Sequence, residues 1–412
     1  MDYIIHSPKR VEVAVLLPGS KSITARALLI RALTRQPGRL SGVPVCDDTQ
    51  AMQRGLAACS GTVDLGMAGT ALRFLTAYHA SQPGHVVTLD GTSRLRERPM
   101  AELVRALRAL GAHIDCPGRA DALPLVVHGC RLHGGRVVMR GDVSSQFVSA
   151  LMMIAPVVGG LEIVLEGDVV SAPYIDMTLC VMRHHGIEAA WQGSTITIPA
   201  GDYCAADLEI EADWSAAAYW LSLQVLLPES RITLLGLRPD SWQGDSRLLA
   251  VMEQMGMTAR WLPGEALTLD MSRTPCCCCS TFADLTGTPD VAPPLITTLC
   301  LLGRPFRITG LRTLRHKESD RREVLRTELR KLGYALQLEG DDGMAWHFEA
   351  CVPQPAPRLD AHGDHRIAMA MALAATRHPG IVVCDAGVVE KSYPSFWQHL
   401  RQAAFNVVAA GG

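Results

Sequence analysis

The densest group of ionisable side chains in this 412-residue sequence lies in the segment HKESDRREVLRTELRKLG, which begins at His316. A helix over this segment would place Lys317, Glu318 and Arg321 on one face, because residues three and four apart are neighbours on a helix. Ordinary charge pairing on an exposed helix has the same pattern. A carboxylate among several cations can also move a proton beside a bound phosphate, since the cations hold the anion while the carboxylate exchanges the proton. The segment is therefore a candidate site for proton transfer next to a phosphate.

Basic residues also recur near short turns rich in Gly, Ser, Thr or Asp that lead into apolar helical runs or lie just before a helix. These residues are Lys21, Arg26, Arg73, Arg98, Arg366 and Lys391. Taken singly, each would be an ordinary solvated surface charge. A helix start, however, offers unpaired N–H groups and the positive end of the helix dipole. Cations that recur beside such starts predict several local sites for anionic ligands.

Such local clusters have to hold any anion, because the whole chain carries a formal net charge of only −2. That balance gives no field to attract nucleic acid or an anionic membrane surface. With 48% hydrophobic and 19% charged residues, the chain is predicted to fold rather than to be disordered. The segment GSKS at 19–22 is not a nucleotide-binding phosphate loop, because Ser20 and Val15 occupy the two positions where that motif requires glycine.

The chain has 13 cysteines and no secretory signal pattern at its start, which favours reduced thiols over a disulfide framework. Four of them form the run Cys276–Cys279. Zinc-ligand pairs are usually separated by about two to four residues so that the chain can turn around the ion, and adjacent thiols cannot reach one tetrahedron. We therefore expect buried or loop thiols in this run, and no metal site.

A repeated unit is predicted to position the candidate residues. Polar turns followed by apolar helical runs begin at Gly66, Gly141, Asp213, Gly287 and Gly363, which lie roughly 75 residues apart. A further copy begins at Gly19, only about 47 residues before the next one. The sequence therefore contains six copies, and the first copy is shortened.

A second signal runs in phase with the first. Helix-period segments end at Gly111, Gly186, Gly256 and Gly333, and alternating apolar and polar residues follow each glycine. This pattern predicts a helix stopped by a left-handed glycine and followed by a strand, with Ala404 in the glycine position of the last copy. The predicted unit is strand, helix, strand, helix, strand. A solenoid that only binds partners would also repeat, but the period here is longer than that of most solenoid units.

The motifs resemble those of the 5-enolpyruvylshikimate-3-phosphate synthases, in the same order, from about Leu17 to about Trp397. They are LPGSKSITARALL, CDD at 46–48, GMAGTALRFL, DGTSRLRERPM, GDVSSQFVSALMMIAP, SAPYIDMTL, EADWSAAAYW, TPDVAPPL, HKESDRREVLRTELRKLG, GDHRIAMAMALAA and EKSYPSFW. One such motif would carry little weight, whereas eleven in order indicate similarity along nearly the whole chain.

The resemblance implies a fold. It is a two-domain inside-out α/β barrel of the enolpyruvyl transferase kind, with six βαβαβ-type repeats, three in each domain. The first domain would span residues 19–211 and contain the shortened repeat. The second would combine residues 1–18 with residues 212–412. Helix starts of both domains are expected to face the interdomain cleft.

The resemblance also implies an activity, the transfer of the enolpyruvyl group of phosphoenolpyruvate to the 5-hydroxyl of shikimate 3-phosphate in the shikimate pathway. The hydroxyl attacks C2 of phosphoenolpyruvate while C3 gains a proton, and the tetrahedral adduct then expels phosphate. Asp290 is expected to act as the base toward the hydroxyl, and Glu318 as the acid toward the methylene carbon. Lys21 would stabilise or protonate the departing phosphate. No metal or organic cofactor is expected, because phosphate leaves readily once its charge is neutralised.

The matched motifs supply two groups of binding residues. Shikimate 3-phosphate is expected to contact Lys21, Ser22, Arg26, Ser144, Ser145, Gln146, Ser171, Tyr174, Asp290, Thr313 and Lys317. Phosphoenolpyruvate is expected to contact Lys21, Gly69, Arg98, Gln146, Arg321, Arg366 and Lys391. Arginine suits this task because its planar fork binds carboxylate or phosphate oxygens in pairs.

Three departures from the family pattern stand out. Met67 and Thr313 each occupy a position where asparagine is common, so we expect one polar contact to be missing and another to reach the shikimate phosphate through water. The first repeat is short by roughly 25 residues, which is expected to remove a strand hairpin from the first domain. None of these departures affects the proposed proton carriers.

Three other functions stay open to comparison. An enzyme acting on UDP-N-acetylglucosamine would usually carry a reactive cysteine five residues before the Arg98-Pro99 pair, where this chain has Ser93. A transferase for another phosphorylated cyclitol would share the same motifs. A catalytically silent anion-binding homologue would not need both Asp290 and Glu318 beside its cations.

The expected partners are small molecules only, namely shikimate 3-phosphate and phosphoenolpyruvate. No nucleic acid or membrane partner is expected, since no apolar run approaches the roughly 18 residues that span a bilayer. We expect a monomer that works in the cytoplasm.

Overall fold

The computed structural model describes residues 1–275 and 279–410. The chain divides into two compact units, which we call the continuous unit and the split unit. The continuous unit is Ser20–Ile210, and the split unit combines Met1–Gly19 with Glu211–Gly412.

Two expectations concern the chain as a whole. The expectation of no metal site in the cysteine run depends on Cys276, Cys277 and Cys278, which lie outside the described residues. No helix in the described part of the chain is long and apolar enough to cross a membrane.

The continuous unit carries the first three repeats. Its helices and strands are α1 (Lys21–Leu33), β3 (Leu40–Ser41), α2 (Asp47–Ala57), β4 (Ser60–Asp64), α3 (Gly69–Ala80), β5 (Val86–Asp90), α4 (Ser93–Glu97), α5 (Ala101–Ala109), β6 (His113–Asp115), β7 (Leu125–His128), β8 (Gly135–Arg140), α6 (Ser145–Ile154), η1 (Pro156–Val158), β9 (Leu161–Glu166), α7 (Ala172–His184), β10 (Ala190–Gln192), β11 (Thr195–Ile198) and β12 (Leu208–Glu209).

The split unit carries the other three repeats. Its helices and strands are β1 (Tyr3–His6), β2 (Glu12–Leu16), α8 (Trp214–Leu226), β13 (Arg231–Leu235), η2 (Gly244–Arg247), α9 (Leu248–Gln254), β14 (Met257–Leu262), β15 (Ala266–Met271), β16 (Thr281–Asp284), η3 (Pro289–Val291), α10 (Ala292–Leu301), β17 (Phe306–Thr309), η4 (Arg312–His316), α11 (Arg321–Lys331), β18 (Gln337–Glu339), β19 (Gly343–Trp346), β20 (Arg358–Asp360), α12 (His365–Ala372), η5 (Leu373–Thr376), β21 (Ile381–Cys384), η6 (Ala386–Lys391), α13 (Phe396–Gln402) and β22 (Asn406–Ala409).

Each full repeat has one strand more than the predicted βαβαβ unit. In the second repeat, β4 and β5 pair in parallel, and the antiparallel strands β7 and β6 extend the sheet in the order β4-β5-β7-β6. The other four-stranded sheets of the described chain have the same order, one parallel pair followed by two antiparallel strands. The glycine stop predicts the first strand after the second helix of each repeat. The additional strand follows later in the sequence, beyond the short pattern around that glycine.

The N-terminal segment completes two sheets of the split unit. Strand β2 pairs in parallel with β13 and so serves as the first strand of the fourth repeat. Strand β1 lies between β21 and β22, antiparallel to both, and so serves as the inner strand of the sixth repeat. Strands more than 370 residues apart in the sequence therefore share a sheet, as Tyr3 and Val383 do.

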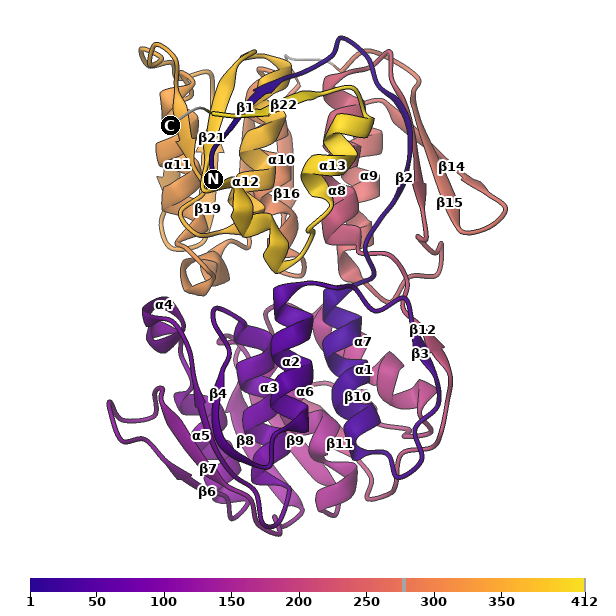
Figure 1. The fold of residues 1–412 in the computed structure, drawn as a ribbon, viewed down its shortest axis with the longest axis vertical. Coiled ribbons are helices and arrows are strands. Elements are labelled where there is room, and N and C mark those ends of the chain that lie inside the picture. Colours follow the sequence, from indigo (N-terminus) through magenta and orange to yellow (C-terminus); the bar gives the residue numbers. More distant parts are fainter. Residues whose placement is uncertain (276–278, 411–412) are drawn as a thin grey trace. The chain divides into compact units, whose positions relative to one another are not determined.

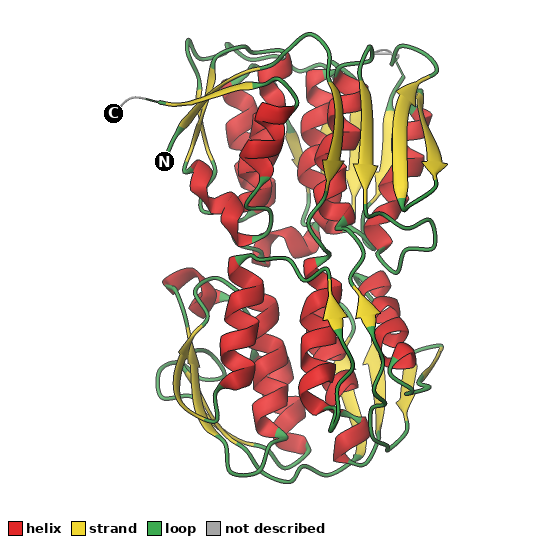
Figure 2. Ribbon diagram, turned by 45° about the vertical axis from the view of Figure 1, so that its right-hand side comes forward, coloured by secondary structure: helices red, strands yellow, loops and turns green. Residues whose placement is uncertain are grey.

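The first helix of each repeat lies inside its unit, and the sheets lie outside (Figures 1 and 2). All ten residues of α10 are buried, as are twelve of the thirteen residues of α8. A helix that is apolar on every side is stable in water only when other elements surround it. In the continuous unit, α1, α3 and α6 pack against one another in the same way. This arrangement is the inside-out barrel that the resemblance implies.

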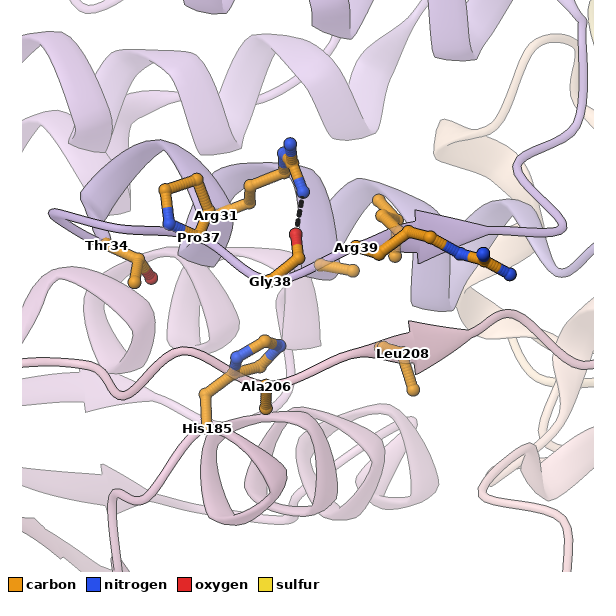
Figure 3. Close-up of a pocket in the computed structure, with 10 residues that line it drawn as sticks. Arg31, Thr34, Pro37, Gly38, Arg39, His185, Ala206 and Leu208 are labelled. Atoms are coloured by element: carbon orange, nitrogen blue, oxygen red, sulfur yellow. Dashed lines mark hydrogen bonds between the residues drawn. The ribbon is translucent and has the colours of Figure 1, made fainter.

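The shortened first repeat forms a sheet of two strands only. Strands β3 and β12 pair in parallel, and no hairpin extends this sheet within the described residues. A cavity of about 10 Å³, with room for roughly one water molecule, lies beside this sheet (Figure 3). Arg31 closes one side of it by donating a hydrogen bond to the carbonyl of Gly38, and His185 lines another side. The predicted loss of a hairpin agrees with this sheet.

The predicted left-handed helix stops are present. Gly111, Gly186, Gly256 and Gly333 have φ angles of 95°, 83°, 95° and 102°. Ala404, in the equivalent place of the last repeat, has a φ of 64° although its side chain disfavours that region. The helix stops therefore confirm the second repeat signal at all five positions.

Candidate active site

Seven charged residues form one group in the split unit, which we call the split-unit cluster. Its members are Asp290, Lys317, Glu318, Arg321, Asp364, Arg366 and Lys391. Arg321 is the first residue of α11 and Arg366 the second residue of α12, while Asp290 lies in η3 just before α10. Turns at the starts of first and second helices in the last two repeats therefore bring these side chains together.

Arg321 is the centre of the split-unit cluster. Only 1% of its side chain is exposed, and its guanidinium contacts three carboxylates. Nε donates to Asp364 Oδ2 at 2.7 Å, Nη1 to Asp290 Oδ1 at 2.9 Å, and Nη2 to Glu318 Oε2 at 2.7 Å. Burial opposes the charge of Arg321, but the three carboxylates, Asp364 first, outweigh burial and raise its pKa. Arg321 is thus a permanent cation that orients three acids.

Glu318 lies between two cations. Its Oε2 accepts from Arg321, and its Oε1 accepts from Lys391 Nζ at 2.7 Å. The side chains of Glu318 and Lys391 are each only 8% exposed. A buried carboxylate with one cation on each oxygen has a fixed direction, which is the first requirement for a group that transfers a proton to one particular atom.

Asp290 faces three cations. Its Oδ1 contacts Lys317 Nζ at 3.1 Å and Arg321 Nη1 at 2.9 Å, and its Oδ2 contacts Arg366 Nη2 at 3.1 Å. Burial would raise the pKa of Asp290, but the charges of Arg366, Lys317 and Arg321 outweigh burial and hold that pKa well below its usual range. Burial also lowers the pKa of Lys317, although Asp290 partly opposes that change. Asp290 is therefore ionised and shared among three cations.

The predicted helix over Lys317, Glu318 and Arg321 is wrong. The 3₁₀ helix η4 ends at His316, Lys317 has an extended backbone, and α11 begins only at Arg321. Asp320 caps α11, because its carboxylate accepts hydrogen bonds from the amides of Arg322 and Glu323. An aspartate that satisfies the first amides of a helix favours a helix start over a helix interior. The contact between Glu318 and Arg321 nevertheless exists, across the turn rather than along a helix.

Arg26 is the central cation of the continuous unit. Its side chain is buried in α1 and donates to Thr178 Oγ1 at 2.7 Å, to Ser149 Oγ at 3.1 Å and to two backbone carbonyls. Those carbonyls belong to Ser22 and Tyr174, two other predicted site residues. No carboxylate contacts Arg26 among the residues that the structure describes, and burial lowers its pKa to about 10. A buried guanidinium held only by neutral groups keeps a net positive charge for an anion.

Lys21 also lies at the start of α1. Its Nζ contacts Asp48 Oδ2 at 2.7 Å, and the two side chains are 16% and 10% exposed. Asp48 is the second residue of α2, so the first two helices of the chain position this pair. Asp48 lies in the CDD motif at 46–48, but the sequence predicted no role for it. The contact with Asp48 fixes the position of the Lys21 ammonium at the start of α1.

Gly69 is packed against two guanidinium groups. A Cβ atom at this position would lie 2.1 Å from Arg98 Nη1 and 2.4 Å from Arg73 Nη1. Arg73 donates to the carbonyls of Gly69 and Pro99, while Nε of Arg98 is buried without a hydrogen-bond partner in the described part of the chain. Gly69 is also the first residue of α3. The start of α3 therefore combines two cations with the positive end of a buried helix.

The remaining predicted residues lie at other helix starts. In the continuous unit, Ser144 caps α6, while Ser145 and Gln146 are its first two residues. Ser171 precedes α7 with a left-handed backbone, φ 58°. In the split unit, Thr313 lies in η4, and its Oγ1 is buried with no hydrogen-bond partner among the described residues. The Thr313 hydroxyl is therefore an unsatisfied buried polar group, of a kind that folded proteins rarely keep without a partner.

Sequence reasoning missed two residues of the split unit. Asp364 is completely buried, caps α12 and holds Arg321. Its position one residue before a helix was a capping signal that could have identified it. Asp245 is buried in η2 and accepts a hydrogen bond from Ser215. No signal in the sequence connects Asp245 with the cluster, because the contact depends on how η2 and α8 pack.

Comparisons with known proteins show which chains are similar to this one. A model of the EPSP synthase (3-phosphoshikimate 1-carboxyvinyltransferase) family matches residues 5–62 and 53–400. A 3-phosphoshikimate 1-carboxyvinyltransferase of Bacteroides fragilis (strain YCH46) is 40% identical over 409 residues, which cover 99% of each chain. One of Syntrophobacter fumaroxidans is 36% identical and covers 94% of this chain and 96% of that protein.

Two solved structures, an EPSP synthase and another enolpyruvyl transferase, have a similar fold. The EPSP synthase of Acinetobacter baumannii has a TM-score of 0.77 at 19% identity, covering 99% of this chain and all of the other. The enolpyruvyl transferase NikO of Streptomyces tendae has a TM-score of 0.73 at 16% identity, covering 100% of this chain and 99% of the other. At these identities the likeness concerns the fold alone.

Proposed function

The chain belongs to the EPSP synthase family, and we propose that it transfers the enolpyruvyl group of phosphoenolpyruvate to the 5-hydroxyl of shikimate 3-phosphate, with release of phosphate. The resemblance and the enolpyruvyl transferase fold expected from the sequence are confirmed. The observation that carries the proposal is the split-unit cluster, where two predicted proton carriers, Asp290 and Glu318, lie among four cations.

The proposed binding roles follow the sequence prediction. The group for shikimate 3-phosphate consists of Lys21, Ser22, Arg26, Ser144, Ser145, Gln146, Ser171, Tyr174, Asp290, Thr313 and Lys317. The group for phosphoenolpyruvate consists of Lys21, Gly69, Arg98, Gln146, Arg321, Arg366 and Lys391. Arg26 and Arg98 support these roles most directly, because both are buried guanidinium groups without a carboxylate partner among the described residues.

The chemistry requires three proton transfers and one leaving group. Asp290 takes the proton of the 5-hydroxyl as its oxygen attacks C2 of phosphoenolpyruvate, and Glu318 gives a proton to C3. In the second step Glu318 takes a proton back from C3 while the bond from C2 to the phosphate oxygen breaks. Lys21 stabilises or protonates the departing phosphate. Each proton carrier is thus paired with cations that offset its charge in one of its two states.

The low pKa of Asp290 bears on its role as a base. In the ligand-free cluster, Arg366, Lys317 and Arg321 stabilise its ionised form, which makes the carboxylate a weak base. Anionic oxygens of the substrates would share the same cations and so offset part of their positive field. The pKa of Asp290 would then rise toward a value at which it can accept a proton. Substrate binding would in this way activate the base only when both reactants are present.

The direct test of the function is phosphate release by the purified protein. Phosphate should appear with phosphoenolpyruvate and shikimate 3-phosphate together, and not with either alone. UDP-N-acetylglucosamine and other phosphorylated cyclitols should fail to replace shikimate 3-phosphate. Equal or faster release with one of those acceptors would assign the protein to that substrate instead.

Gly69→Ala is expected to raise the KM for phosphoenolpyruvate about 10- to 100-fold, because the new methyl group has to displace the guanidinium of Arg98. That range corresponds to the loss of one charge-assisted contact worth roughly 1.5 to 3 kcal/mol. The arginine ends are flexible, so the fold should survive. Steady-state kinetics with each substrate varied in turn would measure the effect.

Two further variants test whether the effect of Gly69→Ala comes from Arg98. Arg98→Ala should reproduce it, since both changes remove the same contact. Gly118→Ala should have no effect, because its Cβ would meet neighbours at an ordinary 3.6 Å. An unchanged KM for phosphoenolpyruvate in Gly69→Ala would show that Arg98 does not bind this substrate.

The remaining expectations stay predictions. They are that the protein is a monomer, that it works in the cytoplasm, and that it has no nucleic acid partner. The small-molecule substrates follow from the family.

A further inference from the structure

A buried carboxylate outside the expected site residues contacts the split-unit cluster through a serine. Asp245 in η2 is 5% exposed, and its Oδ2 accepts a hydrogen bond from Ser215 Oγ. Ser215 Oγ in turn accepts a hydrogen bond from Arg366 Nη2 at 3.2 Å, and the same nitrogen donates to Asp290 Oδ2 at 3.1 Å. Asp245, Ser215, Arg366 and Asp290 thus form one chain of hydrogen bonds.

The donors and acceptors in this chain of hydrogen bonds are compatible with one arrangement of the hydrogens. A serine hydroxyl has one hydrogen to donate and two lone pairs, and an ionised carboxylate can only accept. While Asp245 is ionised, Ser215 has to donate its hydrogen to Asp245 and presents a lone pair to Arg366. The two hydrogens of Arg366 Nη2 are then directed to Ser215 and to Asp290. Because a guanidinium can only donate, the charge state of Asp245 sets only the direction of the hydrogen bond between Asp245 and Ser215, and ionised Asp245 keeps a Ser215 lone pair directed at Arg366.

Ser215 is itself held by its helix. Its backbone amide donates to Asp213 Oδ1, the cap of α8, at 2.7 Å. The Ser215 hydroxyl therefore projects from a fixed first turn of α8. Only the direction in which it donates its hydrogen can still change. Asp245 removes that freedom, and this is a positioning function that a neutral side chain would perform less well.

We propose that Asp245 is a positioning residue for Arg366: through Ser215 it fixes the guanidinium between Ser215 and Asp290, in the orientation that receives phosphoenolpyruvate. This inference rests on the proposed role of Arg366 in binding that substrate. Neither Asp245 nor Ser215 is among the site residues that the sequence predicted.

The charges around Asp245 make it sensitive to pH. Burial, followed by the negative charge of Asp290 in η3, raises its pKa to about 6, while Arg366 in α12 lowers it and Asp213 at the start of α8 raises it. A group with a raised folded-state pKa stabilises the fold below its ordinary value of 3.8 and loses that contribution as the pH rises through about 6. The ionised form at neutral pH therefore costs stability.

The test is Asp245→Asn, which keeps the shape of the side chain and removes its charge. The KM for phosphoenolpyruvate is expected to rise about tenfold, and the KM for shikimate 3-phosphate to stay within about twofold, because only one cation is disoriented. In the wild type, the kcat/KM for phosphoenolpyruvate should fall as the pH drops through about 6, and this component should be absent in Asp245→Asn. Ionisation of the substrate is common to both proteins, so the difference between the two profiles belongs to Asp245.

Variants of Ser215 provide a second test of the proposal. Ser215→Ala should raise the same KM, Ser215→Thr should keep it near the wild-type value, and Ser215→Ala should add little in the Asp245→Asn background. These variants also carry the test if Asp245→Asn does not fold. Additive effects, or equal changes in both KM values, would overturn the proposal.

A matched control separates positioning from general stability. Glu211 is another buried carboxylate with a pKa raised by burial, and it accepts from Ser241 and from the amide of Trp242. Glu211→Gln should leave the KM for phosphoenolpyruvate unchanged. An increase equal to that of Asp245→Asn would show a nonspecific effect and reject the proposal.

A readout without activity distinguishes this inference from the proposed function. Asp245→Asn should unfold at a higher temperature than the wild type at pH 7.5, and the difference should shrink toward pH 5. Ser215→Ala should alter this pH-dependent difference, because it breaks the connection to Arg366. If the wild type releases no phosphate, the proposed function fails, while the presence or absence of this coupling still decides whether Asp245 acts through Ser215.

Discussion

Glu318→Gln is expected to lower turnover about 10²-fold or more while both substrates still bind, as for the loss of a general acid–base group. Glu318 is buried between Lys391 and Arg321, which fix both of its oxygens. A glutamine has nearly the same shape and can still accept from Arg321, but it cannot give a proton to C3 or take one back. Turnover measured at saturating substrates, with calorimetry for binding, would check this result.

The control for this variant is Glu323→Gln. Glu323 lies two residues into α11 and forms an exposed pair with Arg326, so its loss should leave turnover unchanged. Near-normal turnover of a folded Glu318→Gln protein would remove Glu318 from the mechanism. The proton at C3 would then have to come from another group of the split-unit cluster.

Arg321→Met is expected to destabilise the protein by about 3–5 kcal/mol, because it leaves buried carboxylates without their shared cation. Arg321 contacts Asp290, Glu318 and Asp364, and Asp364 is completely buried. Urea unfolding at several pH values would measure the loss. Phosphoenolpyruvate binding should be lost as well, since Arg321 is one of its proposed contacts.

The destabilisation caused by Arg321→Met is expected to depend on pH. In the wild type the pKa of Asp290 is depressed, so its contribution to stability is present above about pH 3.8 and lost as the pH falls below that value. Removal of Arg321 takes away one of the charges that lower the pKa of Asp290, so protonation of Asp290 relieves part of the damage as the pH falls. The destabilisation should therefore be largest near neutral pH and smaller near pH 4.

Arg322→Met is the matched control for Arg321→Met. Arg322 is equally buried in the same turn, but its guanidinium donates to the backbone carbonyls of Asp341, Gly340 and Gly343. Its loss should destabilise the fold by an amount that does not change between pH 7 and pH 4. The same pH dependence in both variants would contradict the carboxylate explanation.

Local patterns in the sequence predicted the repeat and its helix stops. The polar turns and the glycines at 111, 186, 256 and 333 depend on backbone conformation within a few residues, and so they can be read without knowing the fold. The same reasoning failed at Lys317 because Asp320, a strong helix cap, lies inside the charged pattern that suggested a longer helix. It also missed the second strand of each hairpin, which pairs in tertiary structure beyond the pattern at the glycine.

The sequence by itself determined the kinds of residue that the site contains and their position at helix starts. The tertiary structure alone decided which charges meet. Arg321 contacts carboxylates 3, 31 and 43 residues away, and Gly69 must lack a side chain because Arg98 packs against it. The connection from Asp245 through Ser215 to Arg366 likewise joins three separate elements. The physical reason is that capping and helix stops act over a few neighbouring residues, whereas ion pairs and buried hydrogen bonds depend on how distant helix starts pack together.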